Sequence, residues 1–117
     1  MKNNGFIYVA SKHKKFIKAA RYSATSLKDF WPDSNITLFT HEKWVRNEDK
    51  ALFNNIITQD VPDHIRAKLW ALNKTPYDLT CYIDCDTWIE SEEIQNIFEQ
   101  YDFKSDITIT KSRHYAA

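Results

Sequence analysis

Short apolar runs alternate with longer amphipathic stretches along this chain. The runs share a composition of apolar, β-branched and aromatic residues that is typical of buried strands. They lie at residues 6–10, 36–40, 55–58, 80–89 and 106–110. Between residues 14 and 30, apolar or small side chains recur every three or four positions, which predicts an amphipathic helix. Pro32 follows and ends it, because proline cannot continue a helix.

Two further segments have a helical pattern. Residues 65–72 place Ile65, Leu69 and Leu72 on one face, which we expect to be buried. Another helix is predicted from Ser91, a plausible N-cap, to about Tyr101. Its buried residues are expected to be Ile94, Ile97 and Phe98. Residues 41–52 read as an irregular segment or a weak helix, and residues 75–78 as a turn.

Strands that alternate with helices favour parallel pairing through right-handed crossovers. The fold class predicted for residues 1–117 is therefore a single α/β domain. We expect an open, mostly parallel, Rossmann-like sheet with helices on both faces. Ligands of such sheets bind at the carboxyl ends of the strands, where the strand order reverses.

Composition narrows the function classes. The chain has 16 basic and 16 acidic residues, so its formal charge of zero does not indicate a nucleic-acid partner. The basic cluster at residues 12–15 is interpreted as a solvated helix entrance. Gly5 is the only glycine, which argues against a glycine-rich phosphate loop or a dinucleotide-binding fingerprint.

Location follows from similar arguments. No apolar run approaches the roughly 20 residues of a membrane span, and no leader peptide is apparent, so a cytoplasmic protein is expected. Cys81 and Cys85, four residues apart in a predicted strand, would lie about 13 Å apart. A disulfide needs Cα atoms within about 7 Å, so both are expected to be free thiols.

The candidate chemistry lies in one acidic segment. Asp84 and Asp86 come at the end of the apolar strand at residues 80–89, where strand alternation would put both on one face. Two neighbouring carboxylates repel each other, and a hard divalent cation such as Mg²⁺ or Mn²⁺ relieves that repulsion. Lys68, sixteen residues before Asp84, could reach a bound diphosphate. The alternative is a polar strand end beside a surface lysine.

The same region carries a family resemblance. Residues 68–89 read KLWALNKTPYDLTCYIDCDTWI. This run resembles the "K-L…T-P-Y-D…Y-L-D-A-D-T" stretch of nucleotide-diphospho-sugar transferases of the glycosyltransferase-A fold, the glycogenin-like group included. Residues 5–10, 24–28 and 36–40 fit the opening of that family. The resemblance extends from about Gly5 to Asp106.

The resemblance implies roles for particular residues. Asp84 and Asp86 would bind Mn²⁺ or Mg²⁺, Asp84 would also contact the ribose, and Lys68 would meet the diphosphate. Residues Tyr8, Val9 and Ala10 would border the nucleotide base. The implied activity is metal-dependent transfer of a sugar from a nucleotide diphosphate, a UDP-sugar by analogy, to an acceptor hydroxyl.

Alternatives remain open at the level of the sequence. Members of that family are usually longer, and their C-terminal half supplies the acceptor pocket and often a histidine ligand. His114 is the only histidine after the acidic segment, and a tail position is its simpler interpretation. A non-catalytic nucleotide-binding or interaction module, a homo-oligomer, or a subunit that pairs with another half would also fit. A haloacid-dehalogenase-like phosphatase fits less well, because Thr87 directly follows Asp86 and no glycine is present there.

Overall fold

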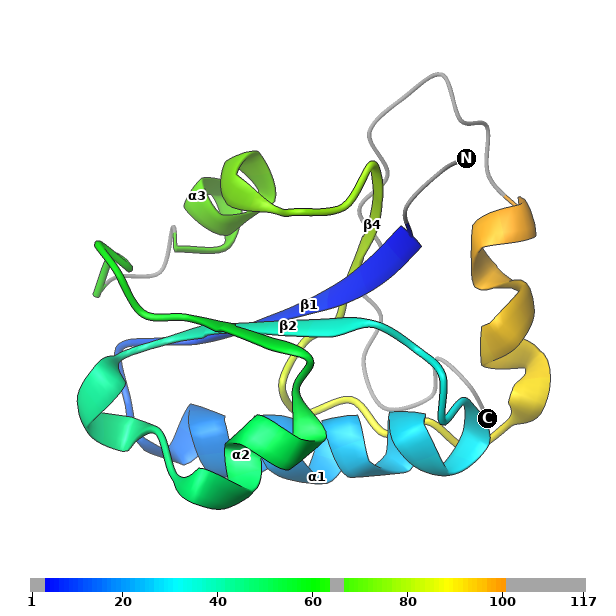
Figure 1. Cartoon of the computed structure of the whole chain (residues 1–117), viewed down its shortest axis with the longest axis horizontal. Helices are drawn as coiled ribbons and strands as arrows, with labels where there is room; N and C mark the ends of the chain where they lie inside the picture. The colour runs from blue at the N-terminus through cyan, green and yellow to red at the C-terminus, as the bar shows by residue number, and fades with distance from the viewer. Residues whose placement is uncertain (1–3, 64–66, 101–117) are drawn as a thin grey trace.

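The computed structural model describes residues 4–63 and 67–100. These residues form a four-stranded sheet, flanked by helices, in which all three strand pairings are parallel (Figure 1). The strands are β1 (Asn4–Ala10), β2 (Ile36–Thr40), β3 (Asn55–Ile57) and β4 (Leu79–Tyr82). The helices are α1 (Lys15–Phe30), α2 (Asn47–Leu52), α3 (Ala67–Lys74) and the 3-10 helices η1 (Glu42–Trp44) and η2 (Glu92–Gln100). The predicted open α/β fold with a parallel sheet is confirmed.

The strand order is β3-β2-β1-β4, so β1 lies inside the sheet and the chain builds outward from it in both directions. In register, Phe6 pairs with Ile36 of β2 and Ile7 pairs with Tyr82 of β4. The chain first moves from β1 to β2 and β3 on one side. It then returns to add β4 on the other side of β1, and this reversal is the position where such sheets bind ligands.

Alternation along β1 divides the core between the two faces of the sheet. Phe6, Tyr8 and Ala10 belong to the core cluster shared with α1 and η2. Ile7 and Val9 belong to a smaller cluster on the other face, with Ala71 and Trp70 of α3. Helices therefore cover both faces, as Figure 1 shows with α1 and α2 below the sheet and α3 above it.

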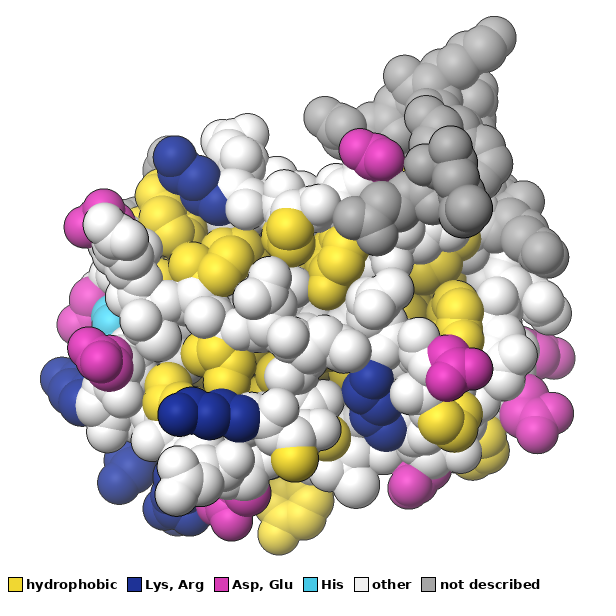
Figure 2. All heavy atoms as spheres, viewed as in Figure 1, with side chains coloured by type: hydrophobic (Ala, Val, Ile, Leu, Met, Phe, Trp, Pro, Cys, Tyr) yellow, Lys and Arg dark blue, Asp and Glu magenta, His cyan; other side chains and the backbone are white. Residues whose placement is uncertain are grey.

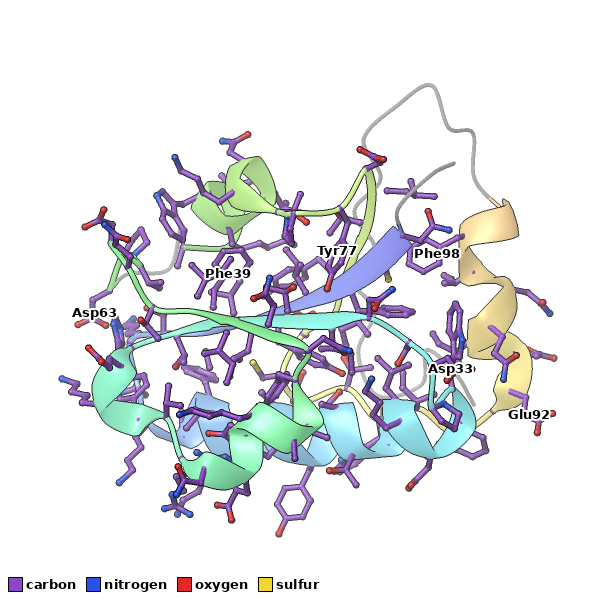
Figure 3. The ribbon with its side chains drawn as sticks, viewed as in Figure 1. Asp33, Phe39, Asp63, Tyr77, Glu92 and Phe98 are labelled. Atoms are coloured by element: carbon purple, nitrogen blue, oxygen red, sulfur yellow. The ribbon has the colours of Figure 1, made fainter. Side chains whose placement is uncertain are left out.

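Helix α1 has the stripe that the sequence predicted. Its buried residues recur at helical spacing and are Ile17, Ala20, Ser23, Ala24 and Leu27. At the far end of this core, Phe98 of η2 and Trp31 pack on Phe6, with ring centroids 5.1 and 5.7 Å from that of Phe6. Figure 3 shows Phe98 pointing from η2 toward the start of β1. Burial of each of the two phenylalanines contributes about 1.5–3 kcal/mol by its apolar area alone.

The prediction of which face of α3 is buried is wrong. Leu69 is 58% exposed, and the residues of α3 that face the sheet are Ala67 and Ala71. Two alanines one turn apart let the helix approach the sheet closely. Trp70 then packs edge-on against Phe39 of β2, with ring centroids 5.8 Å apart. Leu72 is partly buried as expected, whereas Ile65 lies outside the described residues.

Several predicted boundaries also change. The strand predicted at residues 80–89 ends at Tyr82, and the helix after Ser91 is a 3-10 helix that still buries Ile94, Ile97 and Phe98. Residues 41–52, predicted as an irregular segment or a weak helix, form the short helices η1 and α2. The strand predicted at residues 106–110 and His114 lie outside the described residues. Among the residues that the structure describes, no helix has the length and apolarity to cross a membrane.

Candidate functional site

A cleft of about 610 Å³ opens at the carboxyl ends of β1 and β4, the two neighbouring strands where the strand order reverses. Its walls come from the loop after β1, the start of α1, the start of α3 and the turn after β4. The lining residues are Val9, Ser11, Lys12, His13, Lys15, Phe16, Ala67, Lys68, Tyr82, Asp84, Cys85 and Asp86. The strand reversal and the two aspartates predicted from the sequence therefore both indicate this cleft as the candidate site.

Both aspartates belong to a turn that follows β4. The amide of Ile83 still donates to the carbonyl of Ile7 at 3.0 Å, so the chain stays beside β1 for one more residue. The amide of Thr87 then donates to the carbonyl of Asp84 at 3.0 Å, which closes the turn. The strand alternation used to pair Asp84 and Asp86 is therefore wrong, because a turn rather than a strand brings both into the cleft.

Two side-chain hydrogen bonds hold this acidic turn on the scaffold. The thiol of Cys85, between the two aspartates, donates to the carbonyl of Val9 at 3.3 Å. The hydroxyl of Ser26 on α1 accepts from the amide of Ile89 at 2.9 Å. The first bond fixes the turn to the end of β1 and the second fixes its exit to α1. No pattern of apolar residues in the sequence signals the role of Ser26.

The two carboxylates lie in different surroundings. Asp84 is half-buried, whereas Asp86 is exposed. Burial raises the pKa of Asp84, and the nearby charge of Asp86 adds to that rise. The ammonium of Lys68 and a hydrogen bond from Tyr82 oppose it. Positive charge placed beside Asp84 therefore stabilises its ionised form, which a bound cation would do more strongly than Lys68 does.

Lys68 lies on the α3 wall of the cleft and is partly buried. Its ammonium nitrogen lies 4.7 Å from the centroid of the Tyr82 ring, in the range of a cation–π contact. Burial, together with the negative charge of Asp84, raises the pKa of the Tyr82 phenol. Tyr82 therefore remains a neutral hydrogen-bond donor between a carboxylate and an ammonium group.

Of the residues predicted to meet a nucleotide sugar, Val9, Lys68, Asp84 and Asp86 line the cleft together. Tyr8 and Ala10 do not line it. Their side chains are fully buried on the α1 side of the sheet, where the Tyr8 hydroxyl contacts that of Ser23 at 2.6 Å. Strand alternation accounts for this difference, because Tyr8 and Ala10 face the opposite side from Val9.

The loop between β1 and α1 forms a wall that the sequence interpretation missed. Lys12, His13 and Lys15 are exposed at the start of α1, as predicted, and they also line the cleft. Lys12 has φ 74°, and the amide of His13 donates to the carbonyl of Ser11 at 2.9 Å. That geometry is a three-residue turn, rare for a residue other than glycine, and such backbone strain gathers at functional sites. The position of the loop directly after the first strand was the available signal.

A serine, a histidine and an aspartate also meet at the rim of the cleft. The Ser11 hydroxyl lies 3.3 Å from Nε2 of His41, and Oδ1 of Asp63 lies 3.5 Å from the same nitrogen. Ser11 also donates a hydrogen bond to the carbonyl of Pro62. A catalytic triad needs the serine and the acid on different ring nitrogens, so this group does not have the geometry of a serine hydrolase. These contacts connect Ser11, just after β1, to residues 62–63, and Asp63 is labelled in Figure 3.

The residues present fit a hard divalent cation that is shared with a ligand. Within the described residues, no group of three or more histidine, cysteine, aspartate or glutamate side chains could hold a metal ion. Asp84 and Asp86 can supply carboxylate oxygens, the donors that Mg²⁺ and Mn²⁺ prefer, with phosphate and water completing the shell. The Cys85 thiol is not available as a ligand, because it is buried and bonded to the Val9 carbonyl.

No protein-family model matches the sequence, and no curated protein matches it. What the fold and the cleft define is an open-sheet α/β protein with an acidic turn at the strand reversal.

Proposed function

We propose that this cleft binds a nucleotide diphosphate sugar together with Mn²⁺ or Mg²⁺, and that the protein is a glycosyltransferase. The observation that carries the proposal is the meeting of Asp84, Asp86 and Lys68 in one cleft at the strand reversal. A diphosphate needs cations on its oxygens, and two carboxylates need a cation between them and the ligand. One divalent ion meets both needs, which is the usual form of magnesium binding beside phosphates.

The walls of the cleft fit the parts of such a donor. Lys68, Lys12 and Lys15 line the same cleft as the acidic turn, and their ammonium groups can approach phosphate oxygens. Val9 and Phe16 add apolar surface that fits the base or ribose. The cleft volume of about 610 Å³ is in the range of small-molecule sites, roughly 300–1,000 Å³. The family resemblance of residues 68–89 supports the same ligand and favours UDP.

Each side chain at the acidic turn is assigned one role in the proposed reaction. Asp84 and Asp86 would hold the cation, which as a Lewis acid stabilises the negative charge of the departing diphosphate. Lys68 would hold the diphosphate from the α3 side and adds positive charge where that charge develops. The Tyr82 hydroxyl lowers the pKa of Asp84 and so favours the ionised carboxylate that would bind the cation. No residue is assigned as the base that takes the proton from the acceptor hydroxyl.

Titration calorimetry tests the proposal. UDP and GDP are titrated with and without Mn²⁺ into the wild type, Asp86→Ala, and Glu90→Ala. Glu90 is a matched control, because it is also exposed and acidic but does not line the cleft. We expect Mn²⁺-dependent binding of UDP, weakened at least tenfold in Asp86→Ala, about 1.4 kcal/mol, and unchanged in Glu90→Ala. Equal effects of the two substitutions, or binding that ignores Mn²⁺, would contradict the proposed site.

A second assay separates an enzyme from a binding module. Release of UDP from UDP-glucose and UDP-galactose is followed with and without acceptor sugars. Metal-dependent release that Asp86→Ala abolishes supports a transferase. Tight binding without any release, even with acceptors present, would identify a nucleotide-binding module that retains the fold.

A further inference from the structure

Few large hydrophobic side chains are exposed among the described residues, and two of the three are close together. Tyr22 is 73% exposed and Trp88 is 51% exposed, and both line a groove of about 400 Å³. The third, Leu69, lies on α3, away from this groove. Figure 2 shows hydrophobic side chains reaching the surface beside acidic and basic ones along the edge formed by α1 and α2. Exposed aromatic groups that gather in a hollow commonly mark a binding surface.

The groove is built from α1 and the acidic turn. Lys18, Ala19 and Tyr22 share one side of α1, since residues three and four apart lie on the same helix face. Across from them stand Cys85, Asp86 and Trp88. The hydrogen bond from the Ile89 amide to Ser26 ties the residue after Trp88 to α1, one turn beyond Tyr22. The two aromatic residues therefore project from parts of the scaffold that are fixed to each other.

The chemistry of the groove favours a sugar ring over a purely apolar ligand. A pyranose has faces of C–H groups that pack on the negative face of an aromatic ring, and an edge of hydroxyl groups that need polar partners. Tyr22 and Trp88 offer the rings, whereas Asp86 and Lys18 offer an acceptor and a donor in the same groove. The Asp86 carboxylate offers a hydroxyl group of the ligand a hydrogen-bond acceptor that a wholly apolar partner would not use.

The groove also adjoins the main cleft. Cys85 and Asp86 line both hollows, so a ring in the groove would lie next to a ligand on the acidic turn. We propose that the Tyr22–Trp88 groove binds the pyranose ring of a sugar acceptor beside the nucleotide diphosphate site. Calling the bound sugar an acceptor rests on the proposed transferase function. Sugar binding itself can be tested without a nucleotide.

Saturation-transfer NMR tests the groove directly. The probes are methyl β-D-glucopyranoside and maltose, with sorbitol as a control that has hydroxyl groups but no ring. We expect transfer to the ring C–H protons of both pyranosides and none to sorbitol. The signal should fall at least fivefold in Tyr22→Ala and in Trp88→Ala, and should recover in Trp88→Phe. Leu69→Ala, which removes the other exposed hydrophobic side chain, should leave it unchanged.

The outcomes separate this proposal from the function on which it rests. If pyranosides bind in a Trp88-dependent way but UDP does not bind with Mn²⁺, the sugar groove is supported and the transferase function is contradicted. UDP binding with no pyranoside contact keeps the nucleotide site and overturns the groove. Transfer to uridine instead of pyranosides, or Trp88-dependent dimerisation in sedimentation without sugar contact, would assign the groove to another occupant and also overturn it.

Discussion

The thiol of Cys85 donates a 3.3 Å hydrogen bond to the carbonyl of Val9. This bond joins the residue between the two aspartates to Val9, the second-to-last residue of β1. Burial raises the pKa of Cys85 to about 12, so the group stays a neutral S–H donor at physiological pH. The geometry of the acidic pair therefore depends on an uncharged side chain behind it.

Replacing this thiol should disturb the site more than it disturbs the fold. Cys85→Ala is expected to lower the free energy of unfolding by about 1–2 kcal/mol and to weaken Mn²⁺–UDP binding about threefold to tenfold. Cys81→Ala is the matched control, since Cys81 is also a buried cysteine but does not line the cleft. It should cost similar stability and leave binding unchanged. Equal losses of affinity in both variants would contradict a positioning role for Cys85.

A buried ion pair should make stability depend on acid pH. Fully buried Asp49 accepts hydrogen bonds from Arg21 at 2.6 and 2.9 Å and from the amide of Arg46 at 2.8 Å. Burial raises the pKa of Asp49, but these bonds outweigh it and hold that pKa below its ordinary value. A depressed folded-state pKa stabilises the protein above the unfolded value, about pH 3.9, and this stabilisation is lost as the pH falls toward the folded value.

Urea unfolding of wild type and Asp49→Ala checks this sign. At pH 7, Asp49→Ala should lose about 3 kcal/mol, because it leaves the Arg21 charge unpaired at a mostly buried position. The difference between the two proteins should shrink as the pH falls below about 4, the ordinary pKa of an aspartate. A difference that stays constant or grows below that pH would show that the Asp49 carboxylate is not stabilised in the folded state.

Gly5 and Tyr77 form a close contact that has no room for a side chain. A Cβ atom at Gly5 would lie 2.3 Å from ring carbons of Tyr77, whose hydroxyl is held by Thr37 at 2.7 Å. Gly5→Ala should therefore cost about 1–3 kcal/mol, since the ring has to move or lose its hydrogen bond. A double-mutant cycle with Tyr77→Leu measures the coupling, and the cost of Gly5→Ala should be smaller in that background. If the two substitutions have additive effects on stability, the cost of Gly5→Ala does not come from its contact with Tyr77.

Lys68 should contribute to binding through its charge. Lys68→Met is expected to weaken Mn²⁺–UDP binding about tenfold at low salt, and by less at high salt, because salt screens a partly exposed charge. Lys74→Met, at the other end of α3 and outside the cleft, is the matched control and should change little. Calorimetry at two ionic strengths distinguishes the cases. Similar losses in the two variants would indicate a general effect of net charge.

Much of the scaffold was predictable because local patterns determine it. The apolar runs at residues 6–10 and 36–40 have few alternatives to buried strands, and β2 begins and ends at the predicted residues. The stripe on α1 was equally clear. The face of α3 was not, because its contact with the sheet uses Ala67 and Ala71. Small residues give a weak periodic signal, so the larger Leu69 was assigned to the core in their place.

The site was predicted in part. Asp84, Asp86 and Lys68 were found because their residue types and spacing suit a cation and a diphosphate. Their shared cleft depends on the turn closed by Thr87 and Asp84, which strand alternation does not describe. The wall formed by the loop after β1 depends on the left-handed conformation of Lys12, which its sequence does not signal. The roles of Ser26 and Cys85 arise from tertiary contacts alone.

The most direct test of the central claim localises the cation. Amide NMR spectra are recorded with UDP and small additions of Mn²⁺, which broadens the signals of nearby residues. We predict broadening at residues 84–87 and at Lys68, its loss in Asp86→Ala, and none at Lys50 or Asn55, which line a different hollow. Broadening elsewhere, or at residues 84–87 regardless of Asp86, would contradict a metal and diphosphate site on this turn.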